Sequence, residues 1–328
     1  MIIQKGYHIM KTLKESTLTR LPIVCLLASI CCFLWGSAFP SIKIGYRLFA
    51  IKSTDTASQL LFAGVRFALA GALVILIGSI LQKKPLLPHK RSIPDICRLA
   101  LVQTVIQYLF FYIGLANTSG VKSSIIEASN VFLSILAASL VFRYEKLTAS
   151  KLAGCILGFS GVILINTAGG GMDFNMTFTG EGFILISALS YAFSSVLIKK
   201  YSAQENPVTL SGYQFLAGGI FLSLCGFVMG GHLAAFTPAS VLLLVYMALI
   251  SAVAYSLWGI LLKYNPVSRV SVFGFLNPVC GVILSAVLLN EKNQAFSLVG
   301  LISLILVCLG IYVVNRTGKA ASLSRSGS

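Results

Sequence analysis

Long uninterrupted runs of apolar residues recur along the whole chain, and they constrain its fold more than any other feature. Ten such runs, each 19 to 24 residues long, are bounded by charged or turn residues. A helix needs roughly 20 residues to cross the hydrocarbon core, where every backbone polar group must be paired internally. The sequence therefore predicts an all-α polytopic membrane protein with ten transmembrane helices. The runs cover residues 22–42, 58–81, 98–116, 121–142, 150–168, 180–198, 209–230, 240–262, 267–289 and 295–314.

The composition agrees with a chain that is embedded in lipid. Hydrophobic residues make up 57% of the sequence and charged residues 10%, whereas soluble chains carry about 25% charged residues. This shortage of charge excludes a soluble enzyme. The formal net charge of +16 would suit nucleic acid on a soluble protein. Here the basic residues lie between apolar runs, so we expect a lipid bilayer around the protein and no nucleic-acid partner.

Positive charge is distributed unevenly between the two sides of the predicted bundle. With the N-terminus inside, 19 of the 25 Lys and Arg residues lie in cytoplasmic segments, 5 lie in outer segments and Arg66 lies within a span. This asymmetry predicts a multi-pass protein of the plasma (inner) membrane with both termini in the cytoplasm. Residues 1–21 and 316–328 are then cytoplasmic end segments. The first run is longer than a signal peptide, so we expect an uncleaved helix.

The two halves of the chain align with each other at three places. Each half holds five predicted spans, and an odd number of spans turns the second copy upside down in the membrane. The sequence therefore predicts two inverted five-helix repeats, residues 22–168 and 180–315, an architecture typical of secondary transporters. Glu145 and Glu291 match at the ends of the repeats, where we expect a structural cap or an interface role. The aligned pairs are 34–43 with 190–199, 66–71 with 214–219, and 121–154 with 267–300.

Several stretches of sequence also carry a family likeness. They are FLWGSAFPSIKIG at 33–45, RFALAGAL at 66–73, KLAGCILGFSGVILI at 151–165 and FGFLNPVCGVILSAVLLNEK at 273–292. In their order and spacing they resemble the drug/metabolite transporter (DMT) superfamily, specifically its EamA-type ten-helix branch. The resemblance implies export or uptake of small metabolites, but it does not name the substrate. One departure is Phe132, which stands where the second repeat has Pro278, so we expect a proline helix break only in the second half.

Glu127 is the one acid of nine that falls deep in an apolar run. A buried carboxyl is costly unless it is paired, hydrated or protonated. We therefore expect it to bind a proton or a cationic group of a solute. Ser123, Asn130 and Ser134 lie on the same helical stripe. Two alternatives stay open: the carboxyl snorkels to the outer interface, or the stripe supplies hydrogen bonds between helices.

Polar and aromatic side chains recur at helical spacing in other spans as well. Aromatic rings with a polar tip suit a cavity for a flat or amphipathic metabolite, although each of them singly could equally serve packing. Together they predict a central pocket lined by the first, third, fourth, sixth, eighth and ninth helices. The predicted lining residues are Trp35, Gln103, Gln107, Tyr108, Tyr112, Ser123, Glu127, Asn130, Tyr191, Tyr255, Trp258, Phe275 and Asn277.

Arg66 is the second candidate for a coupling residue. By the rise of an α-helix it lies at a depth comparable to that of Glu127, so an ion pair between the two is one interpretation. Local snorkelling, or pairing with a carbonyl group, is the other. The eight cysteines form no CxxC pair and the three histidines lie in termini or loops, so we expect no metal, cofactor or catalytic residue.

The function predicted from these features is a secondary transporter. It would export or import small organic metabolites, such as amino acids or drug-like compounds, by alternating access at the central cavity, with the proton as candidate coupling ion. One alternative is a polytopic membrane enzyme acting on lipid-linked substrates, which needs clustered acids or a buried His beside a nucleophile. The other is a non-transporting membrane scaffold, against which the inverted repeat argues. A monomer and a homodimer both stay open.

Overall fold

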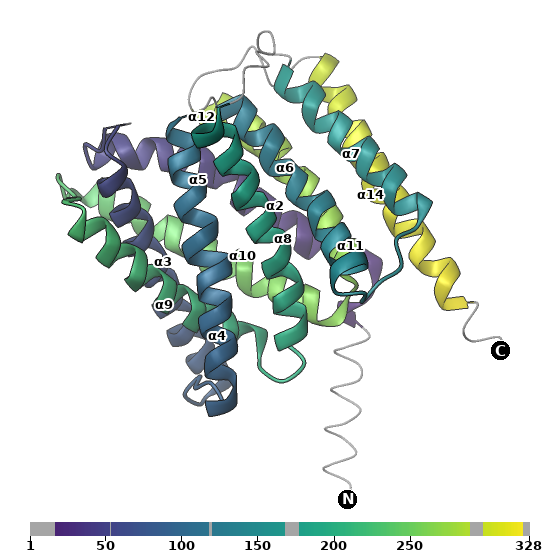
Figure 1. Cartoon of the computed structure of the whole chain (residues 1–328), viewed down its shortest axis with the longest axis horizontal. Helices are drawn as coiled ribbons and strands as arrows, with labels where there is room; N and C mark the ends of the chain where they lie inside the picture. Colours follow the sequence, from purple (N-terminus) through teal and green to yellow (C-terminus); the bar gives the residue numbers. More distant parts are fainter. Residues whose placement is uncertain (1–16, 53, 118–119, 168–176, 289–297, 324–328) are drawn as a thin grey trace, which may run out of the picture.

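Helices account for most of the residues that the computed structural model describes, which are 17–52, 54–117, 120–167, 177–288 and 298–323. They form a bundle in which α2 begins and α14 ends at the same end (Figure 1). The longer helices are α2 (Leu21–Leu48), α3 (Thr56–Gln82), α6 (Gly120–Leu136), α7 (Ala149–Thr167), α8 (Phe183–Tyr201), α9 (Pro207–Val228), α10 (Pro238–Tyr264) and α14 (Leu298–Leu323). The shorter ones are α4 (Ile93–Leu99), α5 (Gln107–Ala116), α11 (Val267–Ser271) and α12 (Leu276–Leu288).

The lengths of these helices bear on the predicted membrane spans. Within the described residues, six helices are long and apolar enough to cross a membrane, and three shorter apolar helices cover 126–141, 149–164 and 301–315. Each of the ten predicted runs overlaps a helical segment. An all-α polytopic membrane protein is therefore confirmed, whereas the count of ten spans stays a prediction. The six are Leu21–Leu48, Thr56–Gln82, Lys90–Leu115, Phe178–Tyr201, Pro207–Val228 and Pro238–Tyr264.

Local sequence explains where several helices begin. The Asp55 carboxylate accepts a hydrogen bond from the Ser58 amide at 3.0 Å and caps α3. The Asn206 side chain caps α9 in the same way, and Thr237 with Ser240 forms a reciprocal capping box on α10. Short polar side chains at these positions satisfy backbone amides that have no partner inside the helix. The helix starts are thus fixed by residues at the ends of apolar runs.

Several helical rods change geometry part of the way along. The π-helical segment η2 (Ala100–Ile106) joins α4 to α5, while η3 (Ala137–Val141) extends α6 and η4 (Phe178–Gly182) precedes α8. The 3-10 segment η5 (Val272–Phe275) lies between α11 and α12, just before Pro278. The helix α6 runs unbroken past Phe132. The regular helix is therefore interrupted beside proline in the second half and not at the matching place in the first, as expected from the sequence.

Glycines let two pairs of helices approach closely. A Cβ on Gly219 of α9 would lie 2.2 Å from the backbone nitrogen of Ala68 on α3. A Cβ on Gly310 of α14 would lie 2.6 Å from the carbonyl oxygen of Gly154 on α7. Both distances are too short for any side chain, so the backbones themselves are in contact, as in other membrane helix pairs. Figure 1 shows α7 and α14 side by side at one edge of the bundle.

The outer surface of the bundle is strongly apolar. Large hydrophobic side chains such as Leu81, Phe227 and Val228 are exposed on α3 and α9. Exposed apolar side chains of this size match the lipid expected around the bundle. Three buried hydrophobic clusters lie among the described residues: one around Trp258 and Phe275, one containing many residues of α3, α5 and the end of α2, and a small aromatic one of Phe67, Tyr191, Phe215 and Tyr255.

Candidate functional site

A small cavity of about 80 Å³ lies in the interior of the bundle. Helices α2, α3, α5, α6, α8 and α10 contribute to its wall, together with the η5–α12 rod. Its size is below the range of about 300–1,000 Å³ that is usual for sites of drug-sized ligands. The cavity therefore suits a small polar solute. Its lining residues are Trp35, Ala38, Ile42, Arg66, Gln107, Tyr108, Phe111, Glu127, Asn130, Tyr191, Tyr255, Gly274 and Asn277.

Most of the residues predicted from polar stripes line this cavity. Eight of the thirteen predicted lining residues do so, and Arg66 joins them from α3, which was not expected to contribute. The sequence reasoning missed Ala38, Ile42, Phe111 and Gly274. Helical spacing would have found three of these, because they lie three to seven residues from Trp35 or Gln107 on the same helix. The five predicted residues that do not line it are Gln103, Tyr112, Ser123, Trp258 and Phe275.

Aromatic rings form one wall of the cavity. The ring of Trp35 lies 5.0 Å from that of Tyr255 and 6.3 Å from that of Tyr191, both edge-on. Trp258 packs behind Trp35 at 5.0 Å and is buried in the hydrophobic cluster, so it supports the wall without forming it. The hydroxyl groups of Tyr108 and Tyr255 are hydrogen-bonded to each other. Edge-to-face packing of this kind holds rings in fixed orientations.

Arg66 brings a positive charge to the cavity. Its side chain is buried, with 3% of the residue exposed, and its Nη2 donates to the Ser251 hydroxyl on α10 at 3.0 Å. The guanidinium carbon lies 4.9 Å from the centroid of the Phe67 ring, within cation–π range. The Nε atom is buried and has no hydrogen-bond partner. In the part of the chain that the structure describes, no carboxylate lies within the 4.0 Å of an ion pair with Arg66.

Glu127 lines the same cavity from α6. Its Oε1 accepts a hydrogen bond from Asn130 Nδ2 at 3.3 Å, one turn along the helix. Its Oε2 is buried without a partner. The interpretation of Glu127 and Arg66 as an ion pair is therefore wrong for this structure: Arg66 instead bonds Ser251. Similar depths along the two helices did not specify how the side chains lie relative to each other across the bundle.

Gln103 belongs to a buried polar network beside the cavity. Its Nε2 donates to Ser194 on α8 at 3.1 Å, and its Oε1 accepts from Gln214 of α9 at 2.9 Å. Thr104 donates to the other end of the Gln214 amide at 2.7 Å. Gln103 was expected to face the cavity with Gln107, but the π-helical geometry of η2 changes the angular spacing of the side chains. Gln103 therefore links three helices and only Gln107 reaches the cavity.

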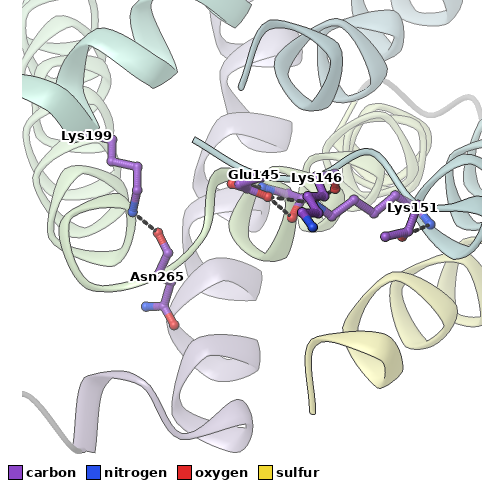
Figure 2. Close-up of polar contacts among 7 residues, drawn as sticks. Glu145, Lys146, Lys151, Lys199 and Asn265 are labelled. Carbon is purple, nitrogen blue, oxygen red and sulfur yellow. Dashed lines mark hydrogen bonds and ion pairs between the residues drawn. The ribbon is translucent and has the colours of Figure 1, made fainter. Parts of the chain in front are cut away.

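A second polar cluster lies between helices at the end of the bundle where α2 begins (Figure 2). Glu145, in the turn before α7, accepts hydrogen bonds from the amide of Ser268 at 3.2 Å and from its hydroxyl group. Lys151 forms an ion pair with Glu145 at 2.9 Å, and both side chains are largely buried, 14% and 8% exposed. Lys199 donates to the carbonyl of Asn265. The cluster thus ties the turn before α7 to the first turn of α11.

The ionisation of Glu145 follows from this environment. Burial raises the pKa of Glu145, but hydrogen bonds from Ser268 and Lys151 and the charge of Lys151 act in the opposite direction and outweigh it. The net pKa lies below the ordinary value of about 4.3. Glu145 is therefore negatively charged at neutral pH. The aligned Glu291 lies outside the described residues.

A lipid-facing apolar bundle around a small, charged polar cavity is the architecture of a membrane transporter. The chain belongs to the EamA-like transporter family, whose sequence model matches residues 22–167 and again residues 178–316. The resemblance to the drug/metabolite transporter superfamily is thereby confirmed.

Relatives and a solved structure agree with this assignment. The chain is 26% identical to "Uncharacterized transporter YvbV" of Bacillus subtilis, over 92% of this chain and 94% of that protein. It is 26% identical to the inner membrane transporter YedA of Escherichia coli, over 90% and 94%. It is 25% identical to the "Probable amino-acid metabolite efflux pump" of Escherichia coli, over 88% and 93%. A crystal structure shares the fold with a TM-score of 0.74 and 17% identity, covering 91% of this chain and 98% of the other.

Proposed function

We propose that this protein is a secondary transporter that exports a small, charged organic metabolite by alternating access at the central cavity. The observation that carries the proposal is the cavity itself, which holds one acid and one base without pairing them. Unpaired charges inside a membrane are costly and are characteristic of substrate and ion pathways. The similarity to an amino-acid metabolite efflux pump supports an amino-acid-like solute and the outward direction.

Two inverted five-helix repeats with ten spans are part of the proposal. The family model matches the chain twice, in segments that correspond to the two halves. Helix packing supports the same symmetry, since α3 packs on its counterpart α9, and α7 on its counterpart α14. The contacts of α2 with α12 and α10 have as counterparts the contacts of α8 with α6 and α5. Rocking of one repeat against the other around the cavity then gives alternating access.

Glu145 supports a closed cytoplasmic side in this arrangement. With both termini in the cytoplasm, as the positive charges predict, the cluster of Glu145, Lys151 and Ser268 lies at the cytoplasmic end. It connects the first repeat to the second, because Ser268 follows α10 and Glu145 precedes α7. We call these three residues the cytoplasmic latch. Its hydrogen bonds hold the two repeats together on that side, and they must break for the cavity to open inward.

Glu127 is proposed as the residue that binds the coupling proton or a cationic group of the solute. One of its oxygens has no partner, and no described cation lies within ion-pair distance. The carboxyl group is therefore available to a ligand. Its place on the cavity wall supports this role over snorkelling to the interface.

Comparison of metabolites tests the proposal directly. Medium from cells that overexpress the protein is compared with medium from cells that lack it, using untargeted mass spectrometry. A transporter of this kind raises at least one small polar metabolite in the first medium. A protein with Glu127→Gln, made at the same level, should lose that difference. Identical media from the two strains, repeated across growth conditions and in solute-loaded proteoliposomes, would contradict transport.

A further inference from the structure

The charge of Arg66 is incompletely satisfied by the protein. A guanidinium has five N–H donors. One of them, on Nη2 of Arg66, donates to the Ser251 hydroxyl at 3.0 Å. The Nε–H group is buried without an acceptor. Removing a cation from water without giving it an anion is strongly unfavourable. The arrangement is therefore complete only when something else supplies the negative charge.

The surroundings of Arg66 indicate what that group is. The phenol groups of Tyr108, Tyr112 and Tyr255 interact electrostatically with the guanidinium. Tyr108 and Tyr255 line the cavity and their hydroxyl groups are hydrogen-bonded to each other, so the accepting hydroxyl keeps its own proton to donate. A planar oxyanion placed at Arg66 would receive two N–H donors along one edge of the guanidinium and a third hydrogen bond from a phenol.

The other charge in the cavity restricts the ligand further. Arg66 is the sole basic residue among the lining side chains, and Glu127 is the sole acid. A phosphate group with two negative charges would meet one cation and would be repelled by Glu127. A carboxylate has a single charge and the planar shape that a guanidinium fork matches.

We propose that Arg66 binds the carboxylate of the transported solute, with Ser251 holding the guanidinium in orientation. This inference rests on the proposed transport function and specifies one end of its substrate. Glu127 takes the cationic end of the same solute. The preference of the protein for a carboxylic acid over its uncharged derivatives then depends on Arg66 of α3.

Ligand binding to the purified full-length protein tests this assignment. The shift of the thermal unfolding midpoint is titrated with L-amino acids of small, branched and aromatic side chains. Each is compared with its amide and with its decarboxylated amine, which keep the ammonium group and lack the carboxylate. For the wild-type protein at least one acid should bind about 10- to 100-fold more tightly than its amide, as expected for hydrogen bonds to a charged group.

Variants assign this preference to Arg66. Arg66→Gln should bind acid and amide equally, and Arg66→Lys, which keeps the charge without the planar fork, should retain a reduced preference. Arg47→Gln, at the exposed end of α2, should behave as the wild type. If Arg66→Gln does not fold, Arg66→Lys decides: an undiminished preference overturns the assignment.

The remaining outcomes separate this inference from the proposed function. Equal binding of acids and amides by the wild type, or no binding of any acid in the panel, overturns the role of Arg66 and leaves export of other solutes intact. A clear preference for acids without any movement of the bound acid across proteoliposome membranes confirms the site and overturns the transport function.

Discussion

Replacing Glu145 by Gln should open the cytoplasmic latch without unfolding the protein. The substitution removes the negative charge that pairs with Lys151 and weakens the hydrogen bonds from Ser268. The side chains of this pair are 14% and 8% exposed, so solvent screens their interaction little. Hydrogen bonds to a charged group contribute about 1.5–3 kcal/mol each, and Gln keeps part of this. We expect a net loss of about 2–3 kcal/mol, which shifts the ratio of closed to open protein about 30- to 150-fold.

Hydrogen–deuterium exchange of the purified protein measures this shift. Peptides from the turn before α7 and from α11 should exchange faster in Glu145→Gln, while peptides from α3 and α9 keep their rates. Lys146→Gln is the matched control, because Lys146 is the neighbouring charged residue and its side chain is exposed. Unchanged exchange of α11 in Glu145→Gln, at normal yield, would refute the reasoning.

The pH dependence of the latch follows from the lowered pKa of Glu145. A carboxyl whose pKa is lower in the folded protein contributes stability above its unfolded pKa of about 4.3. That contribution is lost as the pH falls through the lower, folded value. The hydrogen–deuterium exchange rate of α11 in the wild type should therefore stay constant between about pH 6 and 8. This rate is first corrected for the pH dependence of the intrinsic exchange reaction.

Three further predictions concern other parts of the molecule. Glu127→Gln should give normal yield and thermal stability, since no ion pair with Arg66 is broken. Transport by this variant should lose its dependence on pH or its affinity for the cationic solute, and a normal transport profile would contradict a functional role of Glu127. Gly219→Val should abolish folding, or destabilise the protein by more than about 3 kcal/mol, because the new Cβ would lie 2.2 Å from the Ala68 nitrogen. The control Ala217→Val, on the exposed face of α9, should fold normally. Size-exclusion profiles and unfolding midpoints measure both. Thr237→Ala should lower stability by about 1 kcal/mol through loss of the α10 capping box, and an unchanged unfolding midpoint would argue against the cap.

The fold was predictable to the extent that one-dimensional hydropathy determines it. The apolar runs located the helical segments, because a chain in lipid must pair its backbone within each span. The proline at 278 also marked the place where the regular helix gives way to η5. The interruptions at η2, η3 and η4 were not visible, because a π-helical segment differs from an α-helix by hydrogen-bond register and carries no required residue type.

The candidate site was predictable residue by residue where a polar group stood in an apolar helix. Trp35, Gln107 and Glu127 stood out for that reason, whereas Ala38 and Phe111 resemble their lipid-facing neighbours in composition. Relations between helices could not be predicted: the helical rise placed Arg66 and Glu127 at similar depths but left their arrangement across the bundle open. The choice of Ser251 as the partner of Arg66 depends on how α3 packs against α10, which no spacing within one helix specifies.

The π-helical segment η2 has a consequence for how α5 is oriented. If the whole of η2 relaxed into regular α-helix, everything after it would turn by about 100°. Gln107, Tyr108 and Phe111 would then leave the cavity, and their neighbours would replace them. Gln103 and Thr104 lie within η2 and both bind Gln214 of α9. These two buried hydrogen bonds therefore hold α5 in one rotation about its axis. They determine which face of α5 a solute meets, although neither donor nor acceptor lines the cavity.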